Sequence, residues 1–370
     1  MPDELSITML PAKEGDCLVV SYGDDANRKY ILIDGGRAWT YKNALKKYLA
    51  ESNVGELELV VITHVDRDHI DGMLALIEDP EFDLPVKNVW FNTYDHLNNV
   101  AIVVVDEDDD EEFGGRMGED LSTLLIGKGW PWNKHFDGFA VELNDEPSRN
   151  NIQLGDVRLT LLSPSREKLE KLEPTWKKEC KDAGLKAGYG IEEYVVEDDE
   201  DESFGGGNLN IDQLAAEEFT EDTSNANGSS IAFILEYKGK KLLLSGDAHS
   251  DLLEQELKRL GASAANPLQV DLFKVPHHGS KNNISKPLLE LLNCDNYLVS
   301  TNGNYFKHPS EVGMARLIKF GSENSTICFN YKTEFNKFWG KNSWKSKYKF
   351  DVSYPDDGED GFNTLAFVVD

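Results

Sequence analysis

The feature that most constrains this chain is a short apolar run followed at once by a dense group of histidines and aspartates. Residues 57–62 are mostly apolar and partly β-branched, which is typical of a buried strand. Directly after this run come four side chains that can bind metals, and a helical pattern then begins. They are His64, Asp66, Asp68 and His69. Imidazole and carboxylate groups converging at a strand-to-helix turn bind zinc, manganese or iron, so the spacing predicts a metal site rather than an ordinary solvated loop.

This stretch resembles the His-x-His-x-Asp-His signature of the metallo-β-lactamase fold hydrolases, with Asp66 where the second His usually stands. Further motifs follow in that family's order, each after a predicted strand. They are Asp34-Gly-Gly36, Ser245-Gly-Asp247 and Pro276-His-His-Gly-Ser280. The last two, with Asn227-Gly-Ser-Ser230 and Asn304-Tyr-Phe-Lys-His-Pro309, resemble the competence-protein (ComEC-like) subgroup. The similarity extends from residue 5 to about residue 330.

The resemblance implies two divalent metal ions, with zinc as the first expectation and manganese as the alternative. One metal is assigned to His64 and Asp66, and the second to Asp68 and His69. Asp247 is expected to bridge the two metals. Either His277 or His278 completes the second site, because adjacent strand residues face opposite ways and normally only one of them can bind the same metal.

The first metal site is expected to be poor in imidazole. The family's remaining His has no candidate here, since no His occurs between His135 and His249, and Asn227 lies at about that point. Oxygen-rich sites favour harder ions, which keeps manganese open beside zinc, and occupation of only one site stays open too. The resemblance places Asp34 under the metal site, which it orients through hydrogen bonds. A helix-capping role is the alternative. Asp34 and Asn227 are therefore predicted to support the metal ligands.

The predicted chemistry is hydrolysis by a metal-activated water, most readily of a phosphodiester. Asp68 is counted with the catalytic groups, and His308 is expected to bind substrate or to protonate the leaving group. Other polar residues on the same loops are expected to hold phosphate oxygens. They are Ser280, Lys281, Asn302 and Asn304.

One segment, residues 332–349, is locally basic and interleaves lysines with aromatic side chains. This composition is typical of a surface that follows single-stranded nucleic acid, with Lys341, Lys345 and Lys347 as expected contacts. The alternative is a hairpin whose aromatic residues face the core and whose lysines face solvent.

The order of predicted strands and helices indicates a four-layer αββα sandwich, in which two sheets pack face to face with helices outside. We expect a single domain over residues 1–370, with insertions at about 93–150 and 184–224. Three functions remain open. The first is a metal-dependent phosphodiesterase or nuclease, the second a small-molecule hydrolase acting on a lactone, thioester or cyclic nucleotide, and the third a non-catalytic partner subunit with a degenerate metal site.

Composition limits the partners and the compartment. The formal net charge of −29 argues against a general nucleic-acid coat protein. Two acidic runs, 106–112 and 197–202, read as solvated loops. No apolar run of membrane-spanning length and no signal peptide is recognisable, so no membrane association is expected. Four widely spaced cysteines fit a reducing cytoplasm, and the resemblance implies a protein partner from the same bacterial operon.

Overall fold

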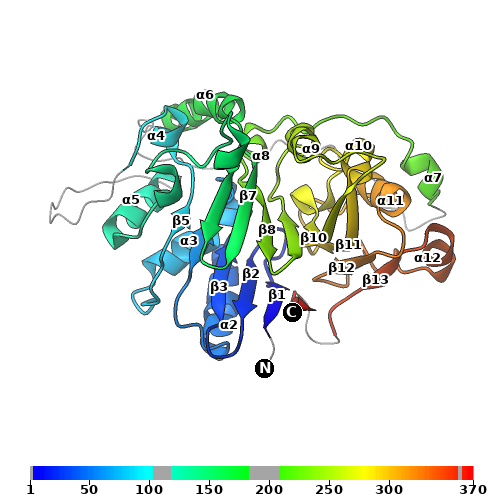
Figure 1. Ribbon diagram of the computed structural model, residues 1–370, viewed down its shortest axis with the longest axis horizontal. Coiled ribbons are helices and arrows are strands. Elements are labelled where there is room, and N and C mark those ends of the chain that lie inside the picture. Colours follow the sequence, from blue (N-terminus) through cyan, green and yellow to red (C-terminus); the bar gives the residue numbers. More distant parts are fainter. Residues whose placement is uncertain (1–2, 103–117, 183–208, 357–360, 370) are drawn as a thin grey trace.

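Two β-sheets form the centre of the computed structural model, which describes residues 3–102, 118–182, 209–356 and 361–369 (Figure 1). The first sheet has the strand order β14-β1-β2-β3-β4-β5. Its strands are β1 (Glu4–Met9), β2 (Leu18–Gly23), β3 (Lys29–Ile33), β4 (Leu59–Val61), β5 (Val89–Trp90) and β14 (Asn363–Val368). The second sheet has the order β13-β12-β11-β10-β9-β8-β7-β6. Its strands are β6 (Asn151–Leu154), β7 (Val157–Ser163), β8 (Ala232–Tyr237), β9 (Lys240–Leu244), β10 (Leu268–Lys274), β11 (Leu292–Val299), β12 (Thr326–Phe329) and β13 (Asp351–Ser353).

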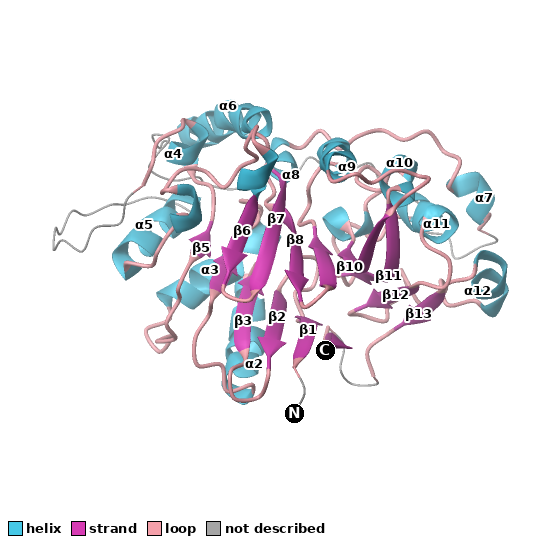
Figure 2. Ribbon diagram, in the orientation of Figure 1, coloured by secondary structure: helices cyan, strands magenta, loops and turns pink. Residues whose placement is uncertain are grey.

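Helices lie outside the two sheets (Figure 2). Those of the first half are α1 (Ala38–Thr40), the π-helical turn η1 (Tyr41–Leu45), α2 (Lys46–Glu51), α3 (Arg67–Glu78), α4 (Tyr94–Leu97), α5 (Gly118–Lys128) and α6 (Arg166–Asp182). Those of the second half are α7 (Ile211–Leu214), α8 (Asn225–Gly228), α9 (Ser250–Arg259), α10 (Lys286–Glu290), α11 (Glu311–Phe320) and α12 (Asn342–Tyr348). Short 3-10 turns are η2 (Lys134–Phe136), η3 (Pro147–Asn150) and η4 (Pro276–Gly279).

Three separate apolar cores show that these elements form four layers. One core joins the first sheet to its helices, a second joins the two sheets, and a third joins the second sheet to its helices. Strand alternation builds them: on β3, Leu32 enters the helix-side core while Ile31 and Ile33 enter the core between the sheets. The predicted αββα sandwich is therefore confirmed, since three buried interfaces require four layers.

The two ends of the chain meet in the first sheet. β14 pairs antiparallel with β1, so the last strand returns to the sheet in which the chain begins (Figure 1). The apolar cores and this pairing join the halves, while the extent of a single domain stays a prediction. Both acidic runs and residues 183–208 of the predicted second insertion lie outside the described residues.

Residues 332–349 do not form the hairpin that was the alternative to a nucleic-acid surface. They contain turns and α12, at the end of the second sheet beside β13 (Figure 1). Trp339 is fully buried, and Trp344 packs partly buried against the same core. Apolar packing of the aromatic side chains, rather than strand pairing, holds this segment.

Parallel strands position the site. β3, β4 and β5 run parallel in the first sheet, and β9 to β13 run parallel in the second. Asp34 follows β3, His64 lies just beyond β4, Asp247 follows β9 and His278 lies just beyond β10. The carboxyl ends of these strands bring all four residues to one rim of the sandwich, where open sheets commonly carry their sites.

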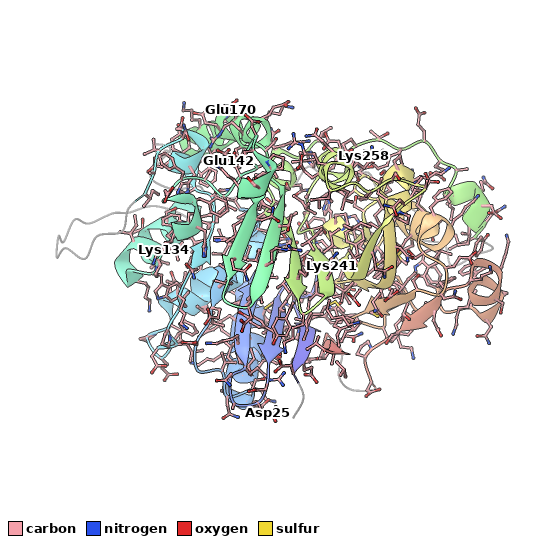
Figure 3. All side chains as sticks on the ribbon, in the orientation of Figure 1. Asp25, Lys134, Glu142, Glu170, Lys241 and Lys258 are labelled. Carbon is pink, nitrogen blue, oxygen red and sulfur yellow. The ribbon has the colours of Figure 1, made fainter. Side chains whose placement is uncertain are left out.

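Charged side chains cover the outer surface. Those labelled in Figure 3 include Glu170 on α6 and Lys258 on α9, both exposed. Within the described part of the chain, no helix combines the length and the apolar character needed to cross a membrane.

Candidate metal centre

Close backbone packing brings the histidine-aspartate turn into place. Gly35 donates its N–H to the carbonyl of His69 at 2.8 Å, and Gly72 donates to the carbonyl of Gly36 at 2.7 Å. A Cβ on Gly72 would lie 1.9 Å from the Gly35 carbonyl oxygen. Glycine is therefore required here, because only backbone without a side chain allows α3 to approach the end of β3 so closely.

Asp34 is the shared support beneath two histidines. It is fully buried, and its carboxylate accepts hydrogen bonds from the Thr63 N–H at 2.8 Å and the Thr63 hydroxyl at 2.7 Å. His69 Nδ1 lies 2.9 Å from the same carboxylate, and His64 Nδ1 lies 2.9 Å from the Thr63 hydroxyl oxygen. Since a carboxylate only accepts, the Thr63 hydroxyl donates its hydrogen bond to Asp34, and its oxygen accepts one from His64. Both imidazoles thus carry their proton on Nδ1.

His278 has the same tautomer by a different route. Its Nδ1 lies 2.7 Å from the Ser300 carbonyl oxygen, which can only accept. All three imidazoles therefore present an unprotonated Nε2 when neutral, which is the form that binds metals. The Nε2 atoms of His64, His69 and His278 are buried and make no hydrogen bond among the described residues. Orphaned buried polar atoms are costly, so three of them at one place fit a site for metal ions.

The second predicted subsite is assembled around Asp247. Its Oδ2 lies 3.4 Å from His69 Nε2 and 3.5 Å from His278 Nε2. Asp68 Oδ2 lies 3.8 Å from His69 Nε2 and 3.5 Å from His278 Nε2. The structure thus brings together two carboxylates and two imidazole nitrogens in a geometry suited to one ion, and their role as ligands is an inference from this geometry.

Asp16 is a competing fourth member that the sequence reasoning missed. One atom each of Asp16, His69, Asp247 and His278 lies within 4.8 Å of the others. However, Asp16 Oδ1 is 3.7 Å from Nδ1 of His278, the nitrogen that already donates to Ser300, and its other oxygen contacts Lys274. Asp68 faces the free Nε2 atoms and is therefore the better ligand. A carboxylate in Gly15-Asp16-Cys17, next to a buried strand, was the available signal.

The first predicted subsite is less complete. His64 Nε2 lies 3.4 Å from Asp66 Oδ2, and Asp66 Oδ1 is buried with no hydrogen-bond partner in the described part of the chain. Asn227 Oδ1 is likewise buried and accepts no hydrogen bond from any described residue, while its amide donates to Asp222 at 2.8 Å. This subsite offers one imidazole and oxygen atoms, and its role in binding a metal stays a prediction.

Of the adjacent histidines, His278 faces the centre and His277 turns elsewhere. Both have left-handed backbone, with φ of 46° and 52°, which are uncommon values for non-glycine residues. His277 Nδ1 lies 3.0 Å from Asn283 Oδ1 and 3.4 Å from Asp222 Oδ2. His277 therefore belongs to a neighbouring network, whose acidic member Asp222 gave no signal in the sequence.

Charge around the centre shifts the pKa of several groups. Burial alone would raise the pKa of Asp68, but the imidazoles of His69 and His278 outweigh it and hold the pKa below its usual range. Burial would lower the pKa of His69, yet Asp247, Asp68 and Asp34 raise it well above the ordinary value. The pocket is thus rich enough in negative charge to attract a proton, and a divalent cation would displace that proton.

His308 lies beside His277, whereas the other predicted substrate residues make local backbone contacts or are exposed. The His308 ring is 5.1 Å from that of His277, centroid to centroid, and both its nitrogens are buried and form no hydrogen bond with the residues that the structure describes. Burial, then the nearby imidazoles, lower the pKa of His308 well below its ordinary value, so its ring is neutral at pH 7. Ser280 and Asn302 accept hydrogen bonds from local backbone, and Asn304 is exposed.

Two of the three predicted nucleic-acid lysines pair with acidic neighbours, and the third lies over an aromatic ring. Lys345 pairs with Asp351 at 2.6 Å and Lys347 with Asp212 at 2.7 Å, while Lys341 lies 4.4 Å from the Trp344 ring centroid. Lys281 forms part of the turn after His278, where its carbonyl accepts from Arg316 at 2.6 Å. The nucleic-acid role of Lys341, Lys345 and Lys347 stays a prediction.

Comparisons with known proteins give distant similarities. No protein-family model matches the chain. ComE operon protein 3 of Bacillus subtilis (strain 168) is 26% identical over 124 residues, which are 32% of this chain and 15% of that protein. The chain thus matches only a small part of that relative.

Solved structures with similar chains include a putative metal-dependent hydrolase from Parabacteroides distasonis, with 12% identity, a TM-score of 0.37 and coverage of 95% of this chain and 93% of that one. Another is the metallo-β-lactamase fold protein YhfI from Bacillus subtilis, with 10% identity, a TM-score of 0.41 and coverage of 99% and 100%. What the site can do chemically therefore follows from its own side chains.

Proposed function

We propose that this protein is a metal-dependent hydrolase that cleaves phosphodiesters, resembling the hydrolase part of ComEC-like proteins. The observation that carries the proposal is a set of three Nε2 atoms, each left free by an acceptor on its Nδ1. Those of His69 and His278 lie near the carboxylates of Asp68 and Asp247, and that of His64 lies near Asp66. Divalent cations held there would supply an activated water and neutralise the charge of phosphate oxygens.

The chain's own residues would orient this chemistry. Asp34 fixes His69 directly and His64 through Thr63, so one buried carboxylate sets the direction of two imidazoles. Such supporting hydrogen bonds raise the basicity of the imidazole and hold its tautomer.

His277 is suited to bind a substrate oxygen at the edge of the centre. Burial would lower its pKa, but Asp222, Asp247 and the hydrogen bond with Asn283 together outweigh that effect and raise the pKa of His277 to about 10. Its side chain is 19% exposed, so a charged ring there can meet an anionic substrate. Neutral His308 beside it would donate or accept a hydrogen bond and would not arrive with a spare proton.

Exposed aromatic side chains near the centre support a substrate that carries aromatic rings. The loop before β2 packs on the metal turn, since a Cβ on Gly15 would lie 1.8 Å from the Asp68 carbonyl oxygen. Lys13 on this loop lies 4.8 Å from the ring centroid of Trp39, which is 44% exposed. The Lys13 carbonyl accepts from Asn302 at 2.8 Å, which links this loop to the segment carrying Tyr305, itself 59% exposed.

Stacking on such rings beside an ammonium group is how single-stranded nucleic acid is commonly bound. We therefore favour a nuclease over a hydrolase of lactones or thioesters. Zinc and manganese are both suited to the donors, with manganese favoured where oxygen dominates.

The experiment compares two substrates with purified protein supplied with zinc or manganese. A small diester, bis(p-nitrophenyl) phosphate, reports the metal centre alone, and a fluorescent single-stranded oligonucleotide reports the full surface. We expect both to be hydrolysed, and we expect W39A with Y305A to slow only the oligonucleotide. F139A, which removes another exposed aromatic ring, is the matched control.

Hydrolysis of neither diester, with cleavage of a lactone or thioester instead, would move the assignment to a small-molecule hydrolase. Metal binding without any hydrolysis would favour a non-catalytic partner subunit.

A further inference from the structure

A fully buried lysine lies against the candidate metal centre. Lys274, on β10, has a side chain with no solvent exposure. Its ammonium group forms a close ion pair with Asp16 Oδ2, lies 3.3 Å from the Gly246 carbonyl oxygen and lies 3.7 Å from Asp247 Oδ1. An ammonium group without water is costly unless it is paired, so these contacts explain how the chain tolerates it.

Asp16 is the counter-ion of this lysine and lies behind the imidazole of His278. The Asp16 side chain is 1% exposed, and its Oδ1 makes no hydrogen bond among the described residues. Asp16 Oδ1 lies 3.7 Å from His278 Nδ1, which is the ring nitrogen opposite Nε2. Asp16 therefore lies at the edge of the centre, behind the imidazole whose Nε2 faces the proposed metals.

The contact with Lys274 divides the two oxygens of Asp247. Oδ1 is on the lysine side, whereas Oδ2 is within 3.5 Å of Nε2 of both His69 and His278. A bridging carboxylate must direct the correct oxygen to the metals, and a fixed cation on the other oxygen supplies that direction. The same cation would repel divalent ions if its charge were not balanced.

We propose that Asp16 and Lys274 form an internal ion pair that positions Asp247 in the metal centre without opposing the metals. Lys274 draws Oδ1 aside, and Asp16 cancels the ammonium charge. Both are positioning residues, because neither faces the free Nε2 atoms. This inference rests on the proposed metal centre but not on the identity of the substrate.

The test measures manganese affinity by titration, with free Mn(II) counted by electron paramagnetic resonance. D16N leaves the Lys274 charge unbalanced, so we expect affinity to fall by at least about tenfold. The double variant D16N with K274M restores the original net charge, so we expect its affinity to exceed that of D16N alone. Loss of direction at Asp247 should still change the resonance signal of the bound ions relative to wild type.

A matched control uses a second ion pair on the same strand. Asp271, in the middle of β10, accepts from Lys240 at 2.9 Å, and D271N should leave manganese affinity unchanged. Thermal unfolding in chelator verifies that every variant is folded. K274M alone is avoided because it would leave two buried carboxylates without their cation.

Wild-type manganese affinity in folded D16N would overturn the inference. A double variant that binds manganese more weakly than D16N would also overturn it, because a purely structural ion pair predicts that ranking of affinities. Wild-type protein that binds no metal would overturn the proposed function as well. Affinity changes as expected, without any diester hydrolysis, would leave this inference standing and remove the phosphodiesterase.

Discussion

The two halves of the candidate centre differ in the number and type of their donor atoms. In one half, the Nε2 atoms of His69 and His278 lie 3.4 and 3.5 Å from Asp247 Oδ2. The same two atoms lie 3.8 and 3.5 Å from Asp68 Oδ2. The other half joins His64 to Asp66 at 3.4 Å, with the Asn227 amide oxygen buried but directed by a separate network. The half around Asp247 has the donors for a firmly held ion, and the half around His64 has those for a harder ion that is held more weakly.

This difference shows how one rim can be tuned by single residues. Asp34 supports both halves, His69 directly and His64 through Thr63, while the donor types of the two halves differ. A change from imidazole to carboxylate oxygen alters metal preference without altering the fold. The predictions below either remove this asymmetry or exaggerate it.

The largest effect is expected from D68A or H69A, which remove the better-assembled half. Each should reduce diester hydrolysis by at least about 100-fold and lower the metal content, since direct donors matter more than their supports. Far-UV circular dichroism should show an intact fold. A fully active D68A protein would show that Asp68 is not part of the centre.

Asp247 tests whether the halves are joined. If its carboxylate serves both ions, D247A should lower the content of both metals together, as measured per mole of protein by inductively coupled plasma mass spectrometry. If D247A loses one equivalent and keeps the other, Asp247 is a terminal donor of the better-assembled half. D251A, on the exposed side of α9, is a control that should retain the wild-type content.

A moderate effect is expected when an imidazole is added to the weaker half. D66H adds an imidazole beside His64 and should raise the preference for zinc over manganese, because nitrogen is the softer donor. Competition titrations with the two ions measure the ratio directly. An unchanged ratio would place Asp66 outside the set of direct donors.

The smallest effect is expected from T63V, which keeps the shape of the side chain but removes the acceptor for His64. Direct support of His69 by Asp34 is retained, so only the weaker half should lose affinity, by about 10-fold to 100-fold. Equal weakening of both ions, resolved in a manganese titration, would contradict separate support of the two imidazoles.

The histidine-aspartate turn was predictable because its four donors lie within six residues and strand and helix signals flank them. The four layers were predictable for a similar reason, since strand alternation is a local pattern. By contrast, the sequence left His277 and His278 equivalent. The choice depends on left-handed backbone angles and on the Ser300 carbonyl, which only the folded chain supplies.

Long-range partners could not be predicted at all. Asp16 and Lys274 are far apart in the chain, and no spacing rule joins them. A lysine inside an otherwise largely apolar strand was a cue that a buried partner must exist, but it did not identify Asp16. The interleaved lysines and aromatic residues of 332–349 were equally ambiguous, because burial of Trp339 against the second sheet decides their arrangement.

The most direct measurement of the central claim is a metal titration of chelator-treated protein at several pH values, followed by bis(p-nitrophenyl) phosphate hydrolysis at each step. Three carboxylates raise the pKa of His69, so a proton competes with the ion, and affinity should fall as pH falls. We predict one tightly bound equivalent, a weaker second one, and hydrolysis that rises with occupancy. A protein that binds no divalent ion at any of these pH values, or hydrolyses the diester equally well in chelator, would contradict the account.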